Sequence, residues 1–243
     1  MGQVIRKSLI LGAAAVLAAC GNGATDSPSA PSSNANSADR TAYERPDDHA
    51  IGSVDAPITI VEYASVTCPG CAYWHQTVYP DFKSRYVDTG KVRYVFREFL
   101  TGSPELAEAG FKIALCADQE NYFKNIGLQF DRLNQILTMA QGGNARAAYI
   151  NLAKASGLSE DEFASCMANL DHRETINSKM QQGFDEGVTG TPAFFANGES
   201  IRLGTVEEMD EVLGELLGET PAESAPSEEA TDTDVLATEE APE

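Results

Sequence analysis

Residues 58–71 read Ile58-Thr-Ile-Val-Glu-Tyr-Ala-Ser-Val-Thr-Cys-Pro-Gly-Cys71, an apolar, β-branched run followed by two cysteines three positions apart. The run predicts a central strand over 58–64. From Cys68 to about Val87 the pattern is helical, with a kink expected at Pro80. The two cysteines are therefore expected where a buried strand ends and a helix begins.

The segments on either side extend this unit into an α/β domain. Residues 91–99 alternate apolar and polar side chains and predict a second strand, parallel to the first because a helical crossover joins them. Helical patterns fill 103–187. Asn197-Gly198 lies between two short strand runs, 192–196 and 199–202, and predicts a hairpin.

Local signals set further helix boundaries. Ser103 and Pro104 form an expected N-cap and first helical position, and Ser159 with Glu162 forms a capping box. Thr205 is expected to cap a last helix. We expect an α/β fold in which a helical subdomain, about 100–187, is inserted between two halves of one domain.

The N-terminus resembles an export signal. Residues 1–19 carry two positive charges before a short apolar run, too short to span a bilayer. The run ends Leu17-Ala-Ala-Cys20, which resembles a bacterial lipobox with Cys20 as the lipidated residue. The alternative is an ordinary signal peptidase site, with Cys20 as an incidental thiol.

The remaining chain divides into three parts by composition. Residues 20–50 are rich in small and polar residues and predict a flexible linker after the lipidated cysteine. The folded body is expected over 51–218. Residues 219–243 contain nine acids and no base, and predict a disordered acidic tail.

The charge balance restricts the partners. The chain has 17 Lys and Arg against 37 Asp and Glu, a formal net charge of −20. Such a surface repels phosphate backbones, which argues against nucleic-acid binding. The three histidines are far apart, which argues against a multi-histidine metal site. Export would place the five cysteines where disulfides persist.

Cys68 and Cys71 carry the chemistry. At a helix N-terminus, free backbone N–H groups and the helix dipole stabilise a thiolate, so Cys68 is expected to be the nucleophile. Cys71, one turn further in and shielded, is expected to keep its proton and resolve a mixed disulfide. This arrangement supports thiol–disulfide exchange.

Other interpretations of the motif stay open. A zinc site needs a second cysteine pair at similar spacing, and Cys116 and Cys166 are 50 residues apart. Haem attachment needs histidine directly after the second cysteine, where this chain has Ala72. A set of Cys68, Cys71 and His75 could hold copper or zinc, and the pair could also be a purely structural disulfide.

The 55–71 segment, Gly190-Thr-Pro-Ala-Phe-Phe195 and the inserted helices resemble the DsbA family over about 51–218. The resemblance implies a thioredoxin fold, an exposed attacking thiol at Cys68 and a resolving thiol at Cys71. It also implies a cis proline at Thr191-Pro192 beside the active pair, with the Thr191 backbone available to an extended substrate strand.

Two further positions are interpreted through this resemblance. Glu62 matches a buried acid that assists proton transfer at the resolving thiol; a salt bridge to Arg97 and a solvent-facing position are the alternatives. Gly70 stands where the family oxidase often has histidine, which predicts a milder oxidant. His75 could partly compensate, although a surface or packing role is expected.

Cys116 and Cys166 are left once Cys20 and the active pair are assigned. Both lie on apolar helical stripes, and in an oxidising compartment a structural disulfide is expected. Two buried free thiols, or a second redox pair, are the alternatives.

These observations predict a monomeric lipoprotein on the periplasmic side of a bacterial cell envelope. It would need no small cofactor and would act as a dithiol oxidase of reduced exported proteins. The resemblance to the DsbA family implies a DsbB-type membrane partner that reoxidises it. A disulfide isomerase or reductase is the enzymatic alternative. A copper or zinc chaperone using Cys68, Cys71 and His75 is the non-enzymatic one.

Overall fold

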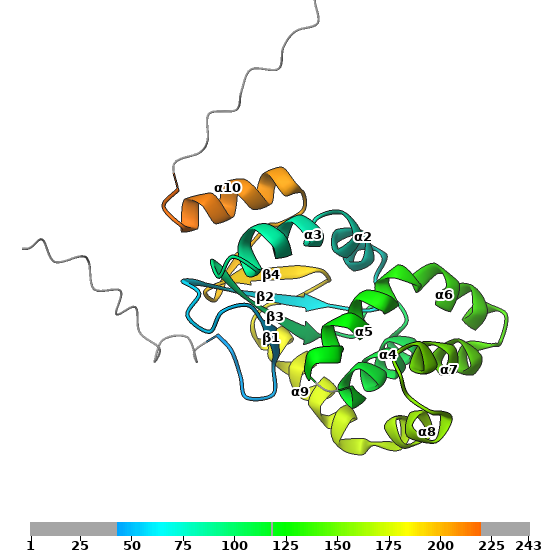
Figure 1. Ribbon diagram of the computed structural model, residues 1–243. Coiled ribbons are helices and arrows are strands. Elements are labelled where there is room, and N and C mark those ends of the chain that lie inside the picture. Colours follow the sequence, from blue (N-terminus) through cyan, green and yellow to red (C-terminus); the bar gives the residue numbers. More distant parts are fainter. Residues whose placement is uncertain (1–42, 118, 220–243) are drawn as a thin grey trace, which may run out of the picture. The chain divides into compact units, whose positions relative to one another are not determined.

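The structure is a computed structural model that describes residues 43–117 and 119–219. Five strands form one sheet in the order β1-β3-β2-β4-β5 (Figure 1). The two central strands, β2 (Ile58–Ala64) and β3 (Val92–Glu98), are parallel and in register from Ile58↔Val92 to Ala64↔Glu98. The predicted parallel pair is therefore confirmed, and both strands end at the same edge of the sheet.

The connection between these strands consists of three short helical segments. They are α2 (Pro69–Thr77), α3 (Tyr79–Phe82) and the π-helical turn η1 (Lys83–Val87). The break falls at Val78, and Pro80 lies in the first turn of α3, where its missing N–H leaves no intrahelical hydrogen bond unmade. The kink expected at Pro80 thus coincides with a helix boundary.

The N-terminal side of the domain begins earlier than expected. We predicted a linker up to residue 50, yet β1 (His49–Ile51) pairs antiparallel with β3. Arg97 donates to Asp48 from two of its nitrogens, and Arg93 pairs with Glu44. These ion pairs hold residues 43–48 on the domain, and composition alone does not reveal them because their partners lie about 50 residues away.

The two faces of the sheet are covered by different helices. Alternate residues of β2 and β3, among them Ile60, Tyr94 and Phe96, pack with α2, α3, α4, α5 and α10. Val61, Tyr63 and Val95 point to the opposite face, where Met180 of α9 (Leu170–Asp185) packs. Figure 1 shows α2, α3 and α10 above the sheet and α9 below it.

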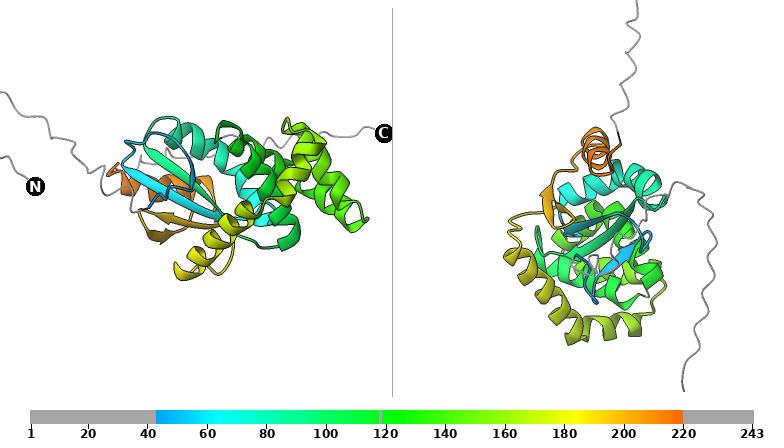
Figure 2. Two further views of the ribbon diagram at one scale, coloured as in Figure 1. Left: turned by 90° about the horizontal axis from the view of Figure 1, so that it is seen from below. Right: turned by 90° about the vertical axis from the view of Figure 1, so that its left-hand side faces the viewer.

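The helical insertion continues from β3. It comprises α4 (Pro104–Cys116), α5 (Gln119–Asp131), α6 (Leu133–Gln141), α7 (Ala145–Ala155), α8 (Glu160–Ala168) and α9. The capping box at the start of α8 is present as predicted, because Ser159 and Glu162 bond each other's backbone N–H groups. Helices α6 to α8 lie beyond the end of the sheet (Figure 2) and share a separate apolar cluster with α4.

The chain returns to the sheet through the predicted hairpin. β4 (Ala193–Ala196) pairs with β2 and with β5 (Glu199–Ile201). The turn residues Asn197 and Gly198 have φ values of 48° and 84°, which their short or absent side chains tolerate. Thr205 caps α10 (Val206–Leu216) by accepting a hydrogen bond from the Glu208 N–H, as predicted.

Several expectations fall on other parts of the chain. The signal sequence over 1–19, Cys20 and nearly all of the 219–243 tail lie outside the described residues. Within the described ranges, no helix combines the length and the apolar character needed to cross a bilayer.

Candidate active site

Cys68 occupies the N-cap of α2, directly after the loop that leaves β2. Its Sγ accepts a hydrogen bond from the Cys71 backbone N–H at 3.4 Å, and in the protonated form the thiol donates to the Thr191 carbonyl oxygen at 3.3 Å. Contact with the Cys71 side chain, opposed by burial and assisted by hydrogen bonds from Thr191 and from the Cys71 and Gly70 backbone, lowers the pKa of Cys68 to about 5. Cys68 is thus a thiolate at neutral pH.

Cys71 lies one turn along α2 and is fully buried. Burial raises the pKa of the Cys71 thiol well above its usual range, and contact with Cys68 and the charge of Glu62 raise it further. Neither cysteine is disulfide-bonded in this structure. The pair therefore combines a charged sulfur and a protonated one, the combination that thiol–disulfide exchange requires.

The exposure of Cys68 differs from the expectation. We predicted an exposed attacking thiol, but Cys68 is only 9% exposed. The Thr191 carbonyl and Pro192 belong to a loop that lies over the start of α2, and this loop accounts for the difference. Thr191 is 123 positions from Cys68 in the sequence, so the burial of the Cys68 sulfur by this loop could not be predicted from the two-cysteine motif.

The Thr191–Pro192 peptide bond is cis. Its loop borders a groove of about 580 Å³ between the start of α2 and the β4–β5 hairpin. Tyr73 and Trp74 of α2 line the groove, together with Phe194 and Leu203. Tyr73 is 63% exposed. The groove can receive an extended segment whose sulfur lies near Cys68.

Glu62 is fully buried beneath the active pair. Its Oε2 accepts hydrogen bonds from the Tyr94 hydroxyl and from Nε2 of His75, the latter at 3.1 Å. Within the described part of the chain, its Oε1 has no hydrogen-bond partner. The alternatives of a solvent-facing position and of a salt bridge to Arg97 are wrong, because Arg97 points to the opposite face and binds Asp48.

His75 does not approach the two sulfurs as a third metal ligand. Its ring stacks on Phe130 with centroids 4.2 Å apart, and its Nε2 contacts Glu62. Among residues 43–117 and 119–219, no three His, Cys, Asp or Glu side chains come together as a metal-binding group. The expected surface position of His75 is also wrong, since its side chain is 6% exposed, whereas the packing role agrees with these contacts.

A group of hydroxyls beside the active pair was missed by the sequence analysis. The Thr101 carbonyl accepts hydrogen bonds from Ser65 Oγ at 3.0 Å and from Thr67 Oγ1 at 2.7 Å. The Thr101 hydroxyl contacts the Thr191 hydroxyl at 2.6 Å. The predicted parallel pairing of β2 and β3 was the available signal, because it places the loops that follow both strands at one edge of the sheet.

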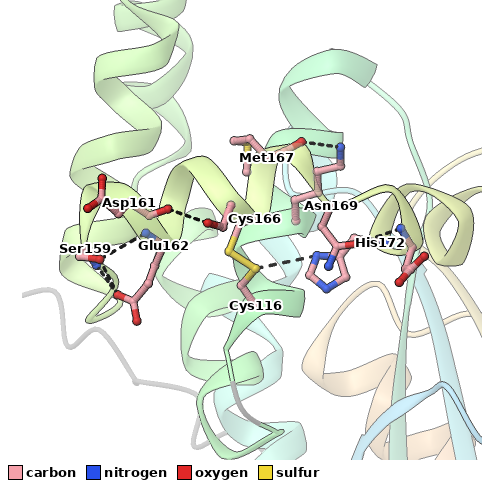
Figure 3. Close-up of a disulfide and its surroundings, with 11 residues drawn as sticks. Cys116, Ser159, Asp161, Glu162, Cys166, Met167, Asn169 and His172 are labelled. Atoms are coloured by element: carbon pink, nitrogen blue, oxygen red, sulfur yellow. Dashed lines mark hydrogen bonds between the residues drawn. A yellow bond between two sulfur atoms is a disulfide. The ribbon is translucent and has the colours of Figure 1, made fainter.

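The second cysteine pair lies in the helical insertion. Cys116, at the end of α4, is disulfide-bonded to Cys166 of α8 (Figure 3). His172 Nδ1 lies 3.9 Å from the Cys116 sulfur. Burial and the nearby Lys112 lower the pKa of His172 from its ordinary value. This disulfide ties α8 to α4 and contributes nothing to the groove.

A comparison with protein families agrees with this geometry. A family model described as thioredoxin matches residues 44–215. The chain belongs to the thioredoxin family. The match begins at residue 44, close to the start of the described residues, and it includes both the sheet and the helical insertion.

Individual relatives place the chain among the DsbA-like thioredoxins. A Rickettsia typhi protein named "putative protein-disulfide oxidoreductase" is 30% identical over 174 residues, which are 70% of this chain and 62% of that protein. A Bacillus cereus protein named "probable disulfide bond formation protein D" is 42% identical over 153 residues, 61% of this chain and 69% of that protein. The chain thus matches less than two thirds of the Rickettsia protein's length.

Solved structures agree on the fold. The crystal structure of Wolbachia pipientis alpha-DsbA1 superposes with a TM-score of 0.62 at 26% identity, covering 74% of this chain and 96% of that one. The chain is therefore a DsbA-like member of the thioredoxin family, with the expected thioredoxin fold and inserted helices.

Proposed function

We propose that this protein is a thiol:disulfide oxidoreductase that exchanges a Cys68–Cys71 disulfide with the thiols of exported proteins, acting as a dithiol oxidase. The observation that carries the proposal is the unequal acidity of the two cysteines. Cys68 has a pKa of about 5, while burial raises that of Cys71. Names of the DsbA-like relatives support the same activity.

The acidity of Cys68 favours the oxidase direction. A thiol with a pKa of about 5 is ionised at pH 7, and this ionisation stabilises the reduced protein by about 3 kcal/mol relative to an ordinary thiol. A stabilised reduced form makes the disulfide a stronger oxidant, by about 60 mV for this two-electron couple. Thiolate stability therefore drives disulfides from the protein to its substrates.

The exchange proceeds in two balanced steps. A substrate thiolate attacks Cys68 Sγ, the Cys68–Cys71 bond breaks, and Cys71 leaves as a thiolate that takes up a proton. A second substrate thiolate then attacks the substrate sulfur of the mixed disulfide, and Cys68 leaves as a stabilised thiolate. The substrate loses two electrons, and the cysteine pair gains them.

The site residues have distinct roles in this proposal. Thr191 and Pro192 position the substrate segment in the groove, where the backbone beside Cys68 can pair with an extended strand. Glu62, buried next to Cys71, exchanges the proton of the resolving thiol. Cys116 and Cys166 hold the helical insertion together and take no part in exchange.

The cellular setting belongs to the same proposal. We infer a lipoprotein anchored through Cys20 on the periplasmic side of the envelope, acting as a monomer on reduced exported proteins. A DsbB-type membrane partner would reoxidise the dithiol. The lipobox-like Leu17-Ala-Ala-Cys20 supports the anchor, and membership of the DsbA-like proteins suggests the partner class.

Gly70 bears on the strength of the oxidant. A Cβ at this position would lie 3.6 Å from Pro192 Cδ and 3.8 Å from Cys68 Sγ, ordinary contact distances. A histidine could therefore begin here without a clash, and its absence leaves the thiolate without a neighbouring cation. This favours a milder oxidant, and it keeps isomerase activity as the second candidate.

The test uses Trp74, the single tryptophan of the chain. It lies in the same helix as Cys71 and lines the groove. Its fluorescence is followed while the protein is titrated across glutathione redox buffers, with the Cys116→Ser/Cys166→Ser variant as control. A midpoint well above the glutathione potential supports an oxidase. A midpoint near that of thioredoxin contradicts it and indicates a reductase, and no redox-dependent signal contradicts every exchange function.

A further inference from the structure

The groove beside the active pair is almost entirely uncharged. Its lining consists mainly of aromatic, aliphatic, hydroxyl and glycine residues, among them Tyr73, Trp74 and Phe194. Among the described residues that line it, Arg202 is the one that carries a charge. Apolar walls accept many side chains, whereas a single cation distinguishes acidic, neutral and basic ones. Arg202 is therefore the lining residue able to recognise the charge of a bound segment.

The backbone of Arg202 is fixed at the border of the groove. It directly follows β5, whose Ile201 pairs with Phe194 of β4. The next residue, Leu203, is buried, and its carbonyl accepts a hydrogen bond from the Trp74 indole of α2. Arg202 thus projects from a short segment that is held by the sheet on one side and by the helix of the active pair on the other.

The side chain of Arg202 is 87% exposed and only loosely paired. Within the described ranges its Nη2 lies 3.8 Å from Glu208 Oε1, which is too long for a hydrogen bond. Glu208 Oε2 accepts a hydrogen bond from the Gly204 N–H at 2.9 Å, beside the N-cap of α10. The N-terminus of α10 stabilises this carboxylate. Arg202 can therefore turn to another anion at little cost to Glu208.

We propose that Arg202 is a specificity-determining residue that binds a carboxylate of the substrate segment. The groove thereby selects reduced proteins that have an aspartate or glutamate near the reactive cysteine. A guanidinium presents its donors in a planar fork that fits a carboxylate, and it repels a lysine or arginine at the same place. The inference deepens the proposed exchange function and rests on it, because it names the class of segment that enters the groove.

The first experiment measures how fast the reduced protein attacks short peptides with one cysteine activated as a pyridyl disulfide. The Cys68 thiolate attacks the peptide sulfur, a bond between these two sulfurs forms, and the pyridyl sulfur leaves as pyridinethione, whose absorbance gives the rate. Each peptide carries a single aspartate, asparagine or lysine, placed in turn at every position around the cysteine.

The aspartate peptide is expected to react about threefold faster than the asparagine peptide at positions on one side of the cysteine, as for an exposed ion pair. The lysine peptide is expected to be the slowest at the same positions. The net charge of −20 disfavours acidic peptides generally, so a preference for aspartate at particular positions identifies a local cation.

Variants of Arg202 assign this preference to its side chain. Arg202→Gln is expected to abolish it, and Arg202→Glu to replace it by a preference for lysine at the same positions. The matched control is Arg173→Gln, because Arg173 is 55% exposed on α9, pairs with Glu108 and does not line the groove. The control changes the net charge equally and is expected to keep the preference for aspartate.

Equal rates for aspartate and asparagine peptides at every position overturn the proposal, and so does a preference that survives in Arg202→Gln. If no peptide releases pyridinethione, the proposed exchange function itself fails. The same peptides with serine in place of cysteine then test Arg202 alone, through the NMR resonance of its Nε–H group. A shift caused by the aspartate peptide and not by the asparagine peptide supports the carboxylate site, and equal or absent shifts overturn it.

Discussion

The two cysteine pairs of this domain differ in separation, surroundings and chemistry. Cys68 and Cys71 are three positions apart on one helix, at the edge where two parallel strands end. Cys116 and Cys166 are 50 positions apart, on two helices of the insertion. Hydrogen-bond donors converge on Cys68, whereas the polar neighbour of Cys116 is His172, whose pKa is lowered by burial. All four residues are cysteines, so the difference in reactivity between the two pairs comes from the groups around each sulfur.

The largest expected effect separates the pairs by activity. Cys68→Ser is expected to abolish oxidation of a reduced model substrate, because it removes the thiol of lowered pKa and leaves only the fully buried Cys71 of the active pair. Cys116→Ser/Cys166→Ser is expected to keep most of the rate. Refolding of a reduced disulfide-containing protein measures both. A Cys116→Ser/Cys166→Ser variant as inactive as Cys68→Ser would show that the second pair is redox-active.

The second expected effect is on the free energy of unfolding. Here the Cys116–Cys166 pair matters more than the Cys68–Cys71 pair, the opposite of their order in activity. The Cys116–Cys166 bond closes a loop of about 50 residues, and its removal is expected to lower the free energy of unfolding by about 4 kcal/mol on chain-entropy grounds. Reducing Cys68–Cys71 is expected to stabilise the protein instead, because the folded state favours the thiolate. Urea denaturation of the wild-type protein in both redox forms of Cys68–Cys71, and of the Cys116→Ser/Cys166→Ser variant, measures these free energies. Equal free energies of unfolding in all of them would contradict a different role of the two disulfides in stability.

The third effect concerns the buried acid beside the active pair. Glu62→Gln keeps the shape and the Tyr94 and His75 contacts but removes the proton acceptor. Transfer of the Cys71 proton is expected to slow on the order of 100-fold, a typical loss for a general acid–base group. Rapid-quench trapping of the mixed disulfide reports this step. Unchanged kinetics with an unchanged redox midpoint would assign Glu62 a packing role.

The smallest effect is a pH dependence confined to the first pair. The folded pKa of Cys68, about 5, lies below that of an unfolded cysteine. Its contribution to stability of the reduced form is therefore complete above about pH 9 and is lost as the pH falls towards 5. Thiolate absorbance and the rate of attack on a small disulfide are expected to fall together around pH 5. A midpoint near pH 8.5 would contradict the assigned surroundings of Cys68.

Much of the fold could be predicted because its signals are local. The central strands, the kink at Pro80, the capping box at Ser159 and the turn at Asn197-Gly198 depend on neighbouring residues. The start of the domain was misplaced because Asp48 is held by Arg97, a contact between distant positions. Glu62 was left with three interpretations for the same reason, since its partners lie on α2 and β3.

The sequence by itself determined the kind of chemistry, because two cysteines one helical turn apart need only their own helix to come together. Only the tertiary structure decided how that chemistry is tuned. Thr191 reaches Cys68 from a loop 123 positions away, and that loop covers the Cys68 sulfur. Helix propensity and spacing act over a few residues, whereas burial and hydrogen bonding of a sulfur depend on every loop that the sheet brings to its edge.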